Sequence, residues 1–340
     1  MAGAIRSFVA RYVELPCRTV SRGVKPAKEP SVCRNNVCLA MPDRAYAKDV
    51  VVSADWVEDR LDQFESDDPA MRLVEVNSPE SPEEDFPSRY DQGHIPGAIG
   101  FQWDEDLSDD VRRDVLSKAE FERVVGDAGI AEDSTVVFYG NGWIANWFAL
   151  FAYWEFKYYG HEDARVLDGG KKYWVNEDYP LTDEVPEFTP REYEARGPFE
   201  GIRAYREDVE QAMESGVPLV DVRSPAEFTG EKIAPEGMSE TAQRGGHIPG
   251  ARNVPVAEVL NDDGTFKSAD ELREIYARRG VDEDESVVTY CRVGERSSIE
   301  WFALRELLGF ADVRNYDGSW TEWGNVVRAP IETGEAGESD

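Results

Sequence analysis

Cysteine is almost absent from the body of this chain: beyond residue 40 the only one is Cys291. A single thiol excludes a disulfide framework, and it excludes the closely spaced cysteine pairs of structural zinc sites. Long apolar runs are also missing, because no stretch approaches the roughly 20 residues that a membrane-spanning helix requires. The sequence therefore predicts a cytoplasmic protein without a membrane span, in which Cys291 is either a buried core residue or a reactive thiol.

Basic residues are scarce relative to acidic ones. The chain holds 37 Lys and Arg against 69 Asp and Glu, which gives a formal net charge of −32. Such a charge repels nucleic acid and anionic membrane surfaces, so neither is expected as a partner. Because 11% of the residues are aromatic and 41% are hydrophobic, disorder does not explain the acidity. We interpret the carboxylates as the hydrated surface of a halophilic protein from a cytoplasm of high salt concentration.

The first 40 residues depart from this composition, with seven basic residues, two acidic residues and three of the four cysteines. We interpret residues 1–47 as an N-terminal extension that is disordered or not native, with a natural start at Met41, where the acidic composition begins. The alternative is a targeting segment, because apolar residues recur at helical spacing among basic ones in this stretch.

The chain contains one series of motifs twice. LVEV at 73–76 returns as LVDV at 219–222, and GHIPGA at 93–98 returns unchanged at 246–251. Three more matches follow in the same order: 136–139 with 287–290, 147–150 with 301–304, and 168–170 with 317–319. All the offsets lie between 146 and 154 residues. Matches in one order at a nearly constant separation indicate a duplicated domain.

Each half alternates short β-branched runs with helix-like stretches. In the first half we expect elements at these positions: strands at 73–76, 135–139 and 164–167, and helices at 118–128 and 146–158. The alternation predicts an α/β fold of two tandem domains, each a mostly parallel sheet flanked by helices. We expect the domains at 48–183 and 201–334, joined by a linker at 184–200 that is rich in proline and charge.

The duplication supplies an internal control, because features of both halves serve folding and features of one half are candidates for function. His94 and His247 both lie in GHIPGA, so we interpret both as holding a loop rather than as catalytic. Cys291 follows the strand that ends at Tyr290, whereas Gly140 follows the equivalent strand of the first half. The first-half loop is also three residues shorter.

The segment from Cys291 to Ser298 precedes a stretch of helical spacing, so we expect the cysteine at a strand-loop-helix turn. A free thiol ionises near pH ~8.5 and only its thiolate attacks. Backbone N–H groups that point inward beside a helix N-terminus would favour that anion. Arg292 and Arg296 add positive charge within an otherwise acidic protein. The loop therefore favours a catalytic thiol over an inert one.

A further cation distinguishes the two halves: Arg223 follows strand 219–222, whereas Asn77 follows its counterpart. The C-terminal ends of neighbouring parallel strands meet at one edge of a sheet. Arg223 is therefore a candidate to face the loop that begins at Cys291. The alternative is a structural ion pair between Arg223 and Glu227.

These motifs resemble those of tandem-domain rhodaneses. The likeness covers roughly residues 48–332 and is carried by both GHIPGA segments, the strand end DVR at 221–223, the loop CRVGERS at 291–297, and DGSW at 317–320. The loop and the DGSWTEW segment are similar to those of thiosulfate sulfurtransferases in that family. GHIPGA alone would indicate only the fold.

The resemblance implies that the Cys291 thiolate takes the outer sulfur of thiosulfate as a persulfide and passes it to cyanide, a thiol or a protein cysteine. The persulfide would lie among backbone amides of five loop residues: Arg292, Val293, Gly294, Glu295 and Arg296. Arg223 and Arg292 would orient the donor, and Arg296 with Ser297 would close the loop. No metal or organic cofactor is implied.

Three alternatives stay open. Thiosulfate enzymes of the family often carry a second basic residue where this chain has Val293, so a 3-mercaptopyruvate sulfurtransferase remains possible, although Arg292 favours thiosulfate. Phosphatases and arsenate reductases share the fold with a Cys-x5-Arg loop, but Arg296 makes this one Cys-x4-Arg, a smaller cradle that suits sulfur better. The third alternative is a non-enzymatic sulfur-carrier or regulatory module.

Overall fold

The computed structural model describes residues 45–78, 89–109, 111–140, 144–235 and 241–335. The predicted extension 1–47, with the start proposed at Met41, lies outside these ranges except for its last three residues. In those three, the Tyr46 hydroxyl donates to the carbonyl of Lys267 at 2.8 Å. The Ala47 N–H donates to the carbonyl of Leu307 at 2.7 Å. The chain is therefore bonded to the second half before its first strand begins.

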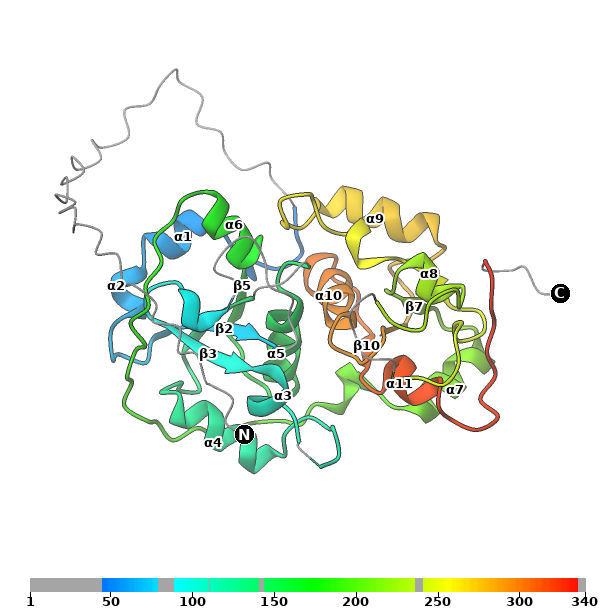
Figure 1. Ribbon diagram of the computed structural model, residues 1–340, viewed down its shortest axis with the longest axis horizontal. Helices are drawn as coiled ribbons and strands as arrows, with labels where there is room; N and C mark the ends of the chain where they lie inside the picture. The colour runs from blue at the N-terminus through cyan, green and yellow to red at the C-terminus, as the bar shows by residue number, and fades with distance from the viewer. Residues whose placement is uncertain (1–44, 79–88, 110, 141–143, 236–240, 336–340) are drawn as a thin grey trace, which may run out of the picture. The chain divides into compact units, whose positions relative to one another are not determined.

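Each half contains one five-stranded sheet among the described residues, and every neighbouring pair of strands is parallel (Figure 1). The first sheet has the order β1-β5-β4-β2-β3, and the second has the matching order β6-β10-β9-β7-β8. The first-half strands are β1 (Val51–Val52), β2 (Met71–Asn77), β3 (Ala98–Gln102), β4 (Thr135–Gly140) and β5 (Ala164–Leu167). The second-half strands are β6 (Arg203–Ala204), β7 (Leu219–Asp221), β8 (Arg252–Asn253), β9 (Val287–Tyr290) and β10 (Val313–Tyr316). The predicted α/β fold of two tandem parallel-sheet domains is confirmed.

Helices connect the strands in both halves. The first half has α1 (Ala54–Glu58), α2 (Leu61–Phe64), α3 (Trp103–Asp106), α4 (Lys118–Asp127), α5 (Trp147–Tyr158), α6 (Gly170–Asn176) and a 3-10 turn η1 (Tyr90–Gln92). The second has α7 (Arg206–Ser215), α8 (Pro225–Phe228), α9 (Ala269–Arg278), α10 (Ser297–Phe302), α11 (Ser319–Trp323), 3-10 turns η2 (Glu200–Ile202) and η3 (Val256–Glu258), and a π-helical turn η4 (Ala303–Leu307). Helices α4 and α9 begin with the same capping box, a serine that exchanges hydrogen bonds with the glutamate three residues later. None of the helices in the described ranges is long and apolar enough to cross a bilayer.

The five first-half elements that the sequence predicted are all present, whereas β1, β3, α1, α2, α3 and α6 were not predicted. The expected strand at 164–167 is β5 with the same bounds, and the other four expected elements agree with β2, β4, α4 and α5 to within two residues. The predicted linker at 184–200 contains no helix or strand before η2 begins at its last residue.

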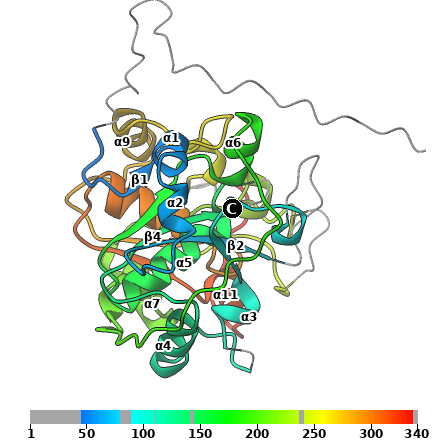
Figure 2. The same cartoon turned by 90° about the vertical axis from the view of Figure 1, so that its left-hand side faces the viewer.

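The two faces of the first sheet bury alternate residues of its strands, as a β-strand dictates. Val136 and Phe138 of β4 pack into the cluster that contains α5, whereas Val137 and Tyr139 pack with residues of α1, α2 and α6. Figure 2 shows α1 and α2 on the face of the sheet that buries Val137 and Tyr139. The sheet is therefore covered by helices on both faces, which accounts for its continuous apolar strands.

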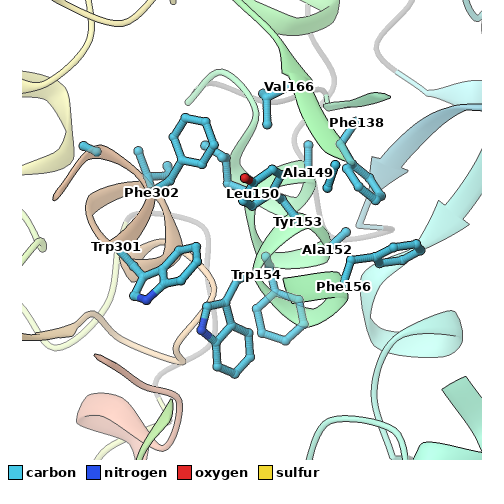
Figure 3. Close-up of a cluster of buried hydrophobic side chains, with 14 of the residues drawn as sticks. Phe138, Ala149, Leu150, Ala152, Tyr153, Trp154, Phe156, Val166, Trp301 and Phe302 are labelled. Atoms are coloured by element: carbon cyan, nitrogen blue, oxygen red, sulfur yellow. The ribbon is translucent and has the colours of Figure 1, made fainter. Parts of the chain in front are cut away.

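The apolar layer that holds α5 continues into the second half, where it holds α10. Figure 3 shows Tyr153 and Trp154 of α5 beside Trp301 and Phe302 of α10. The rings of Tyr153 and Phe302 meet edge to face with centroids 4.9 Å apart. The aromatic residues of α5 therefore pack the junction between the halves.

The two GHIPGA histidines make the same kinds of contact, a ring stack and a bond to a backbone carbonyl. The His94 ring stacks on Tyr90 at 3.8 Å, with its Nδ1 3.0 Å from the carbonyl of that residue. The His247 ring stacks on Phe228 at 3.6 Å, with its Nδ1 2.8 Å from the Phe228 carbonyl. Both histidines therefore hold a loop. Their Nδ1 atoms contact backbone carbonyls and not Cys291.

A buried carboxylate lies at or near the carboxyl end of the equivalent strands β2 and β7. In the first half, Glu75 accepts the hydroxyl of Tyr139 at 2.6 Å and pairs with Lys171 Nζ at 2.6 Å, and the side chains of Glu75 and Lys171 are both 0% exposed. In the second half, Asp221 pairs with Arg223 at 2.6 Å, again at 0% exposure. The cation comes from α6 in one half and from the strand end in the other, so each half neutralises its carboxylate by a different route.

We predict that Lys171→Met destabilises the protein strongly, because it leaves Glu75 charged and buried without its cation. Breaking a buried pair from one side costs about 3–5 kcal/mol of unfolding free energy. The adjacent Lys172→Met, which removes the same charge at a partly exposed position, serves as the control. Denaturant unfolding in high salt, followed by tryptophan fluorescence, measures both. Equal midpoints for the two variants would contradict the structural role of the pair.

Candidate active site

Cys291 lies at the carboxyl end of β9, directly after Tyr290. On one side, β9 pairs with β7, and Asp221 of β7 lies opposite Tyr290. The chain leaves β7 toward one edge of the sheet and β9 toward the other, so the strand order reverses between them. Open parallel sheets bind their ligands at such a switch point, outside the carboxyl ends of the strands.

The sulfur of Cys291 faces the loop that follows it. The N–H of Gly294 donates to Sγ over 3.0 Å. The side chain is 0% exposed and borders the apolar cluster that contains α10. The thiol is therefore buried, but its sulfur is directed at a backbone amide of the loop rather than away from it.

The loop depends on a glycine at position 294. Gly294 has a φ of +104°, and a Cβ on it would lie 2.4 Å from the backbone oxygen of Asp317. A side chain is excluded both by the left-handed backbone and by the contact with the segment after β10. This close approach brings the Gly294 amide to the sulfur.

Two residues that sequence reasoning missed support the loop from β10 and the turn after it. The Asn315 Nδ2 donates to the carbonyl of Gly294 at 3.0 Å. The hydroxyl of Ser319 accepts the N–H of Cys291 at 3.1 Å. Ser319 has a φ of 50°, a conformation that costs energy outside glycine. We infer that the strain is tolerated because it brings the hydroxyl to the cysteine amide.

A signal for both residues existed in the repeat. Ser319 corresponds to Gly170, whose φ is 59°, so the second half carries a side chain where the first needs none. Asn315 corresponds to Val166, an apolar residue of β5. In each case a polar side chain appears only in the half that has the cysteine.

Ser297 and Arg292 are fixed by further bonds. The Ser297 hydroxyl lies 2.9 Å from the carbonyl of Gly294 and 2.6 Å from Asn315 Oδ1. The carbonyl of Arg292 accepts both the N–H and the hydroxyl of Thr321, each at 2.8 Å. The side chain of Arg292 is buried, and Val293 is half-buried. The loop is therefore bonded along its length to α11 and β10.

Arg296 closes the far end of the loop. Its Nη2 and Nη1 donate to the two carboxylate oxygens of Glu227 at 2.9 and 3.3 Å. Burial acts to lower the pKa of Arg296, but the pair with Glu227 outweighs it and raises the pKa above its ordinary value. The guanidinium also lies over the ring of Trp147, 5.4 Å from its centroid. The first half thus contributes a side chain to the loop's surroundings.

Arg223 is held by a neighbour that the sequence did not suggest. Its Nε and Nη2 donate to the carboxylate of Asp221 at distances of 2.6 to 3.1 Å, and Nη2 also donates to the carbonyl of Gly246 at 2.7 Å. The expected alternative, an ion pair with Glu227, is wrong, because Glu227 pairs with Arg296. The carboxylate two residues earlier in the chain lies closer to the guanidinium. The guanidinium stacks on Trp320 at 4.5 Å.

The loop also brings a carboxylate to the sulfur. Glu295 is 2% exposed, and its Oε2 lies 3.8 Å from Cys291 Sγ. Gly294 and Glu295 of the loop therefore both contact the sulfur, whereas the guanidinium of Arg223 is bonded to Asp221 at the strand end. Within the described ranges, no three His, Cys, Asp or Glu side chains are grouped so that they could hold a metal.

The chain belongs to the family of proteins with rhodanese-like domains, because the family's model matches residues 53–177 and 205–325. A Haloferax volcanii protein named "Putative thiosulfate sulfurtransferase" is 61% identical over 86% of this chain and 100% of its own length. "Sulfur carrier protein TtuD" of Thermus thermophilus is 49% identical over 84% of this chain and 98% of its own length. These relatives make the chain a member of the rhodanese-type sulfurtransferase family, and the Haloferax relative agrees with a halophilic protein.

Solved structures resemble the chain as well. The anaerobic ergothioneine biosynthesis enzyme from Chlorobium limicola, in complex with trimethyl histidine, superimposes with a TM-score of 0.72. It is 26% identical, and the match covers 84% of this chain and 70% of the enzyme. A related structure, of EanB, holds a cysteine persulfide in a tetrahedral intermediate state with ergothioneine.

We predict that Gly294→Ala lowers sulfur transfer by at least ~100-fold, because the amide that donates to the sulfur must move when the new Cβ meets Asp317. Gly216→Ala is the matched control. Gly216 is also left-handed, with a φ of +77°, but a Cβ there meets nothing within 4 Å. Both variants should lose about 1–2 kcal/mol of stability, because alanine disfavours a left-handed backbone. Only Gly294→Ala should also displace the loop. Similar activities for the two variants would contradict the role of the Gly294 amide.

A second prediction concerns pH. Burial acts to raise the pKa of Glu227, but Arg296 outweighs it and holds that pKa below its ordinary 4.5. A lowered carboxyl pKa stabilises the folded state fully above the ordinary value, and this stability is lost as the pH falls through the lowered one. Wild type should therefore exceed Glu227→Gln in unfolding free energy by about 3–5 kcal/mol at neutral pH. The gap should narrow below pH 4.5.

Urea unfolding of both proteins across this pH range measures the gap. The control is Glu258→Gln, which breaks a half-exposed pair with Arg279 and should cost less than about 1 kcal/mol. A gap between wild type and Glu227→Gln that is independent of pH would show that the ion pair does not stabilise the loop's surroundings.

Proposed function

We propose that the protein moves the sulfane sulfur of thiosulfate to a thiophilic acceptor through a persulfide on Cys291. The observation that carries this proposal is the hydrogen bond from the Gly294 amide to Cys291 Sγ, in a loop whose first-half counterpart has Gly140 in place of the cysteine. A sulfur held by a backbone donor at the carboxyl edge of a parallel sheet is suited to carry negative charge. The first half keeps the same fold without the thiol and serves as a scaffold.

The reaction would proceed by double displacement. The Cys291 sulfur attacks the outer sulfur of thiosulfate, the sulfur–sulfur bond of the donor breaks, and sulfite leaves with the bonding electrons. The terminal sulfur of the persulfide then carries the negative charge, which the loop amides stabilise. A thiolate or cyanide attacks this terminal sulfur and releases Cys291. The two steps balance without a metal, an organic cofactor or an external oxidant.

The arginines would divide the work of binding the donor. Arg292, beside the cysteine, would contact the sulfonate oxygens of thiosulfate together with the loop amides. Arg296 closes the loop through Glu227. Arg223 would contribute its positive charge from the strand end, since two of its nitrogens are already bonded to Asp221. The family resemblance implied that Arg223 and Arg292 both orient the donor, whereas we propose that only Arg292 contacts it.

The rival functions are less well supported. In a phosphatase the arginine that ends the loop would bind the phosphate, whereas Arg296 is bonded through both terminal nitrogens to Glu227. A 3-mercaptopyruvate donor remains the alternative substrate. The relative named a sulfur carrier favours a protein cysteine as the cellular acceptor. A carrier would form the persulfide once per molecule without repeated turnover.

The decisive comparison is thiocyanate formation from thiosulfate and from 3-mercaptopyruvate, in high salt, by wild type and by Cys291→Ser. We expect turnover by wild type with a preference for thiosulfate, and none by the variant, which keeps the other three cysteines of the chain. Equal rates for the two proteins would refute the proposed function. A preference for 3-mercaptopyruvate would make that compound the donor instead of thiosulfate. A single turnover per molecule would favour a sulfur-carrier function.

A further inference from the structure

The carboxylate of Glu295 lies beside the reactive thiol. Its Oε2 is 3.8 Å from Cys291 Sγ, within reach of a weak S–H donor, and the side chain is almost wholly buried. The same sulfur accepts the N–H of Gly294. Sγ therefore accepts a hydrogen bond from the amide and, as a thiol, is placed to donate one to the Glu295 carboxylate.

Other charged groups around the loop have partners of their own. Arg296 of the same loop is paired with Glu227 of α8. Among the described residues, Asp317, after β10, pairs with Arg203 and Arg113, Arg203 also pairs with Asp114, and Asp221, at the end of β7, pairs with Arg223. Glu295 is outside these ion pairs, although it interacts electrostatically with Arg296. Arg292 is a second buried cation of the loop.

A carboxylate at this position would be a liability if its only effect were electrostatic. Attack on thiosulfate requires a thiolate, and a buried negative charge at 3.8 Å opposes a second one on the sulfur. It also opposes the approach of a dianionic donor. The arrangement becomes favourable if the carboxylate takes up the thiol proton as the sulfur attacks, because the pair then carries one negative charge before and after the transfer.

The duplicated half supports a link between this carboxylate and the chemistry. The first-half loop from Gly140 to Asn146 has lost the cysteine, and its sequence contains no acidic residue. The second-half loop contains one thiol and one carboxylate. Both groups are therefore present in the catalytic copy and absent from the other.

We propose that Glu295 is the general base that accepts the proton of Cys291, an inference that rests on the proposed sulfurtransferase function. The proton moves from Sγ to the Glu295 carboxylate as the sulfur electron pair attacks the outer sulfur of thiosulfate and sulfite departs. Cysteine thiol, thiosulfate and carboxylate become cysteine persulfide anion, sulfite and carboxylic acid, so the total charge is unchanged. When the acceptor removes the outer sulfur, the released Cys291 regains its proton from Glu295.

The test is the pH dependence of persulfide formation in Glu295→Gln. A single turnover with thiosulfate is quenched and the persulfide is quantified by mass spectrometry. General-base catalysis contributes about 10²- to 10⁴-fold, so we expect a loss of this size at pH 6. The loss should shrink toward the ordinary ionisation of a thiol near pH ~8.5, where hydroxide removes the proton. Wild type should show a flatter profile.

Two further variants separate this role from structural effects. Glu274→Gln removes the same charge from an exposed position of α9 and should match wild type at every pH. Glu295→Asp retains a carboxylate, so it should keep the flat profile at a reduced rate. If Glu295→Gln fails to fold, this aspartate variant decides, because a steep profile with an intact carboxylate would overturn the proposal.

The remaining outcomes are equally clear. An unchanged rate and profile in folded Glu295→Gln would make Glu295 a bystander, and a faster rate at every pH would show that the carboxylate only repels the donor. Either result overturns the inference while the sulfurtransferase function stands. Failure of wild type to form any persulfide would refute the underlying function instead.

Discussion

The hydrogen bond from the Gly294 amide to the sulfur of Cys291 is the contact on which this site depends. It requires a left-handed glycine pressed against the segment after β10, and that segment is in turn bonded to the cysteine through Ser319. The conformation of the loop therefore depends on contacts between the chain after β9 and the chain after β10, and not on the loop's own sequence alone. Because protein interiors are densely packed, a small displacement of either strand end would move the amide away from the sulfur.

The first half contributes contacts that support this arrangement. Trp147 covers the guanidinium of Arg296, and Arg113 lies 3.4 Å from the carboxylate of Asp317 behind the loop. The apolar layer between α5 and α10 is shared by both halves, so neither could be removed without exposing aromatic surface of the other. This dependence gives a physical reason to retain a domain that has lost its thiol.

Much of the fold followed from the sequence, because alternating β-branched and helical segments indicate a parallel sheet and five motifs recur in the same order in the second half. The position of Cys291 followed from comparing the copies. The partner of Arg223 did not, since Asp221 and Glu227 are both within reach along the chain and only side-chain direction decides between them. Asn315 and Ser319 differ from Val166 and Gly170 in the repeat, but their bonds to the loop arise from tertiary packing.

The proposed function depends on Cys291 carrying the transferred sulfur. Its most direct test is to treat the protein with one equivalent of thiosulfate, block remaining thiols, and map the added sulfur by peptide mass spectrometry. The account predicts one additional sulfur atom on the peptide containing Cys291 and the release of one equivalent of sulfite. Sulfite release with the sulfur found on another cysteine, or no added sulfur at all, would contradict it.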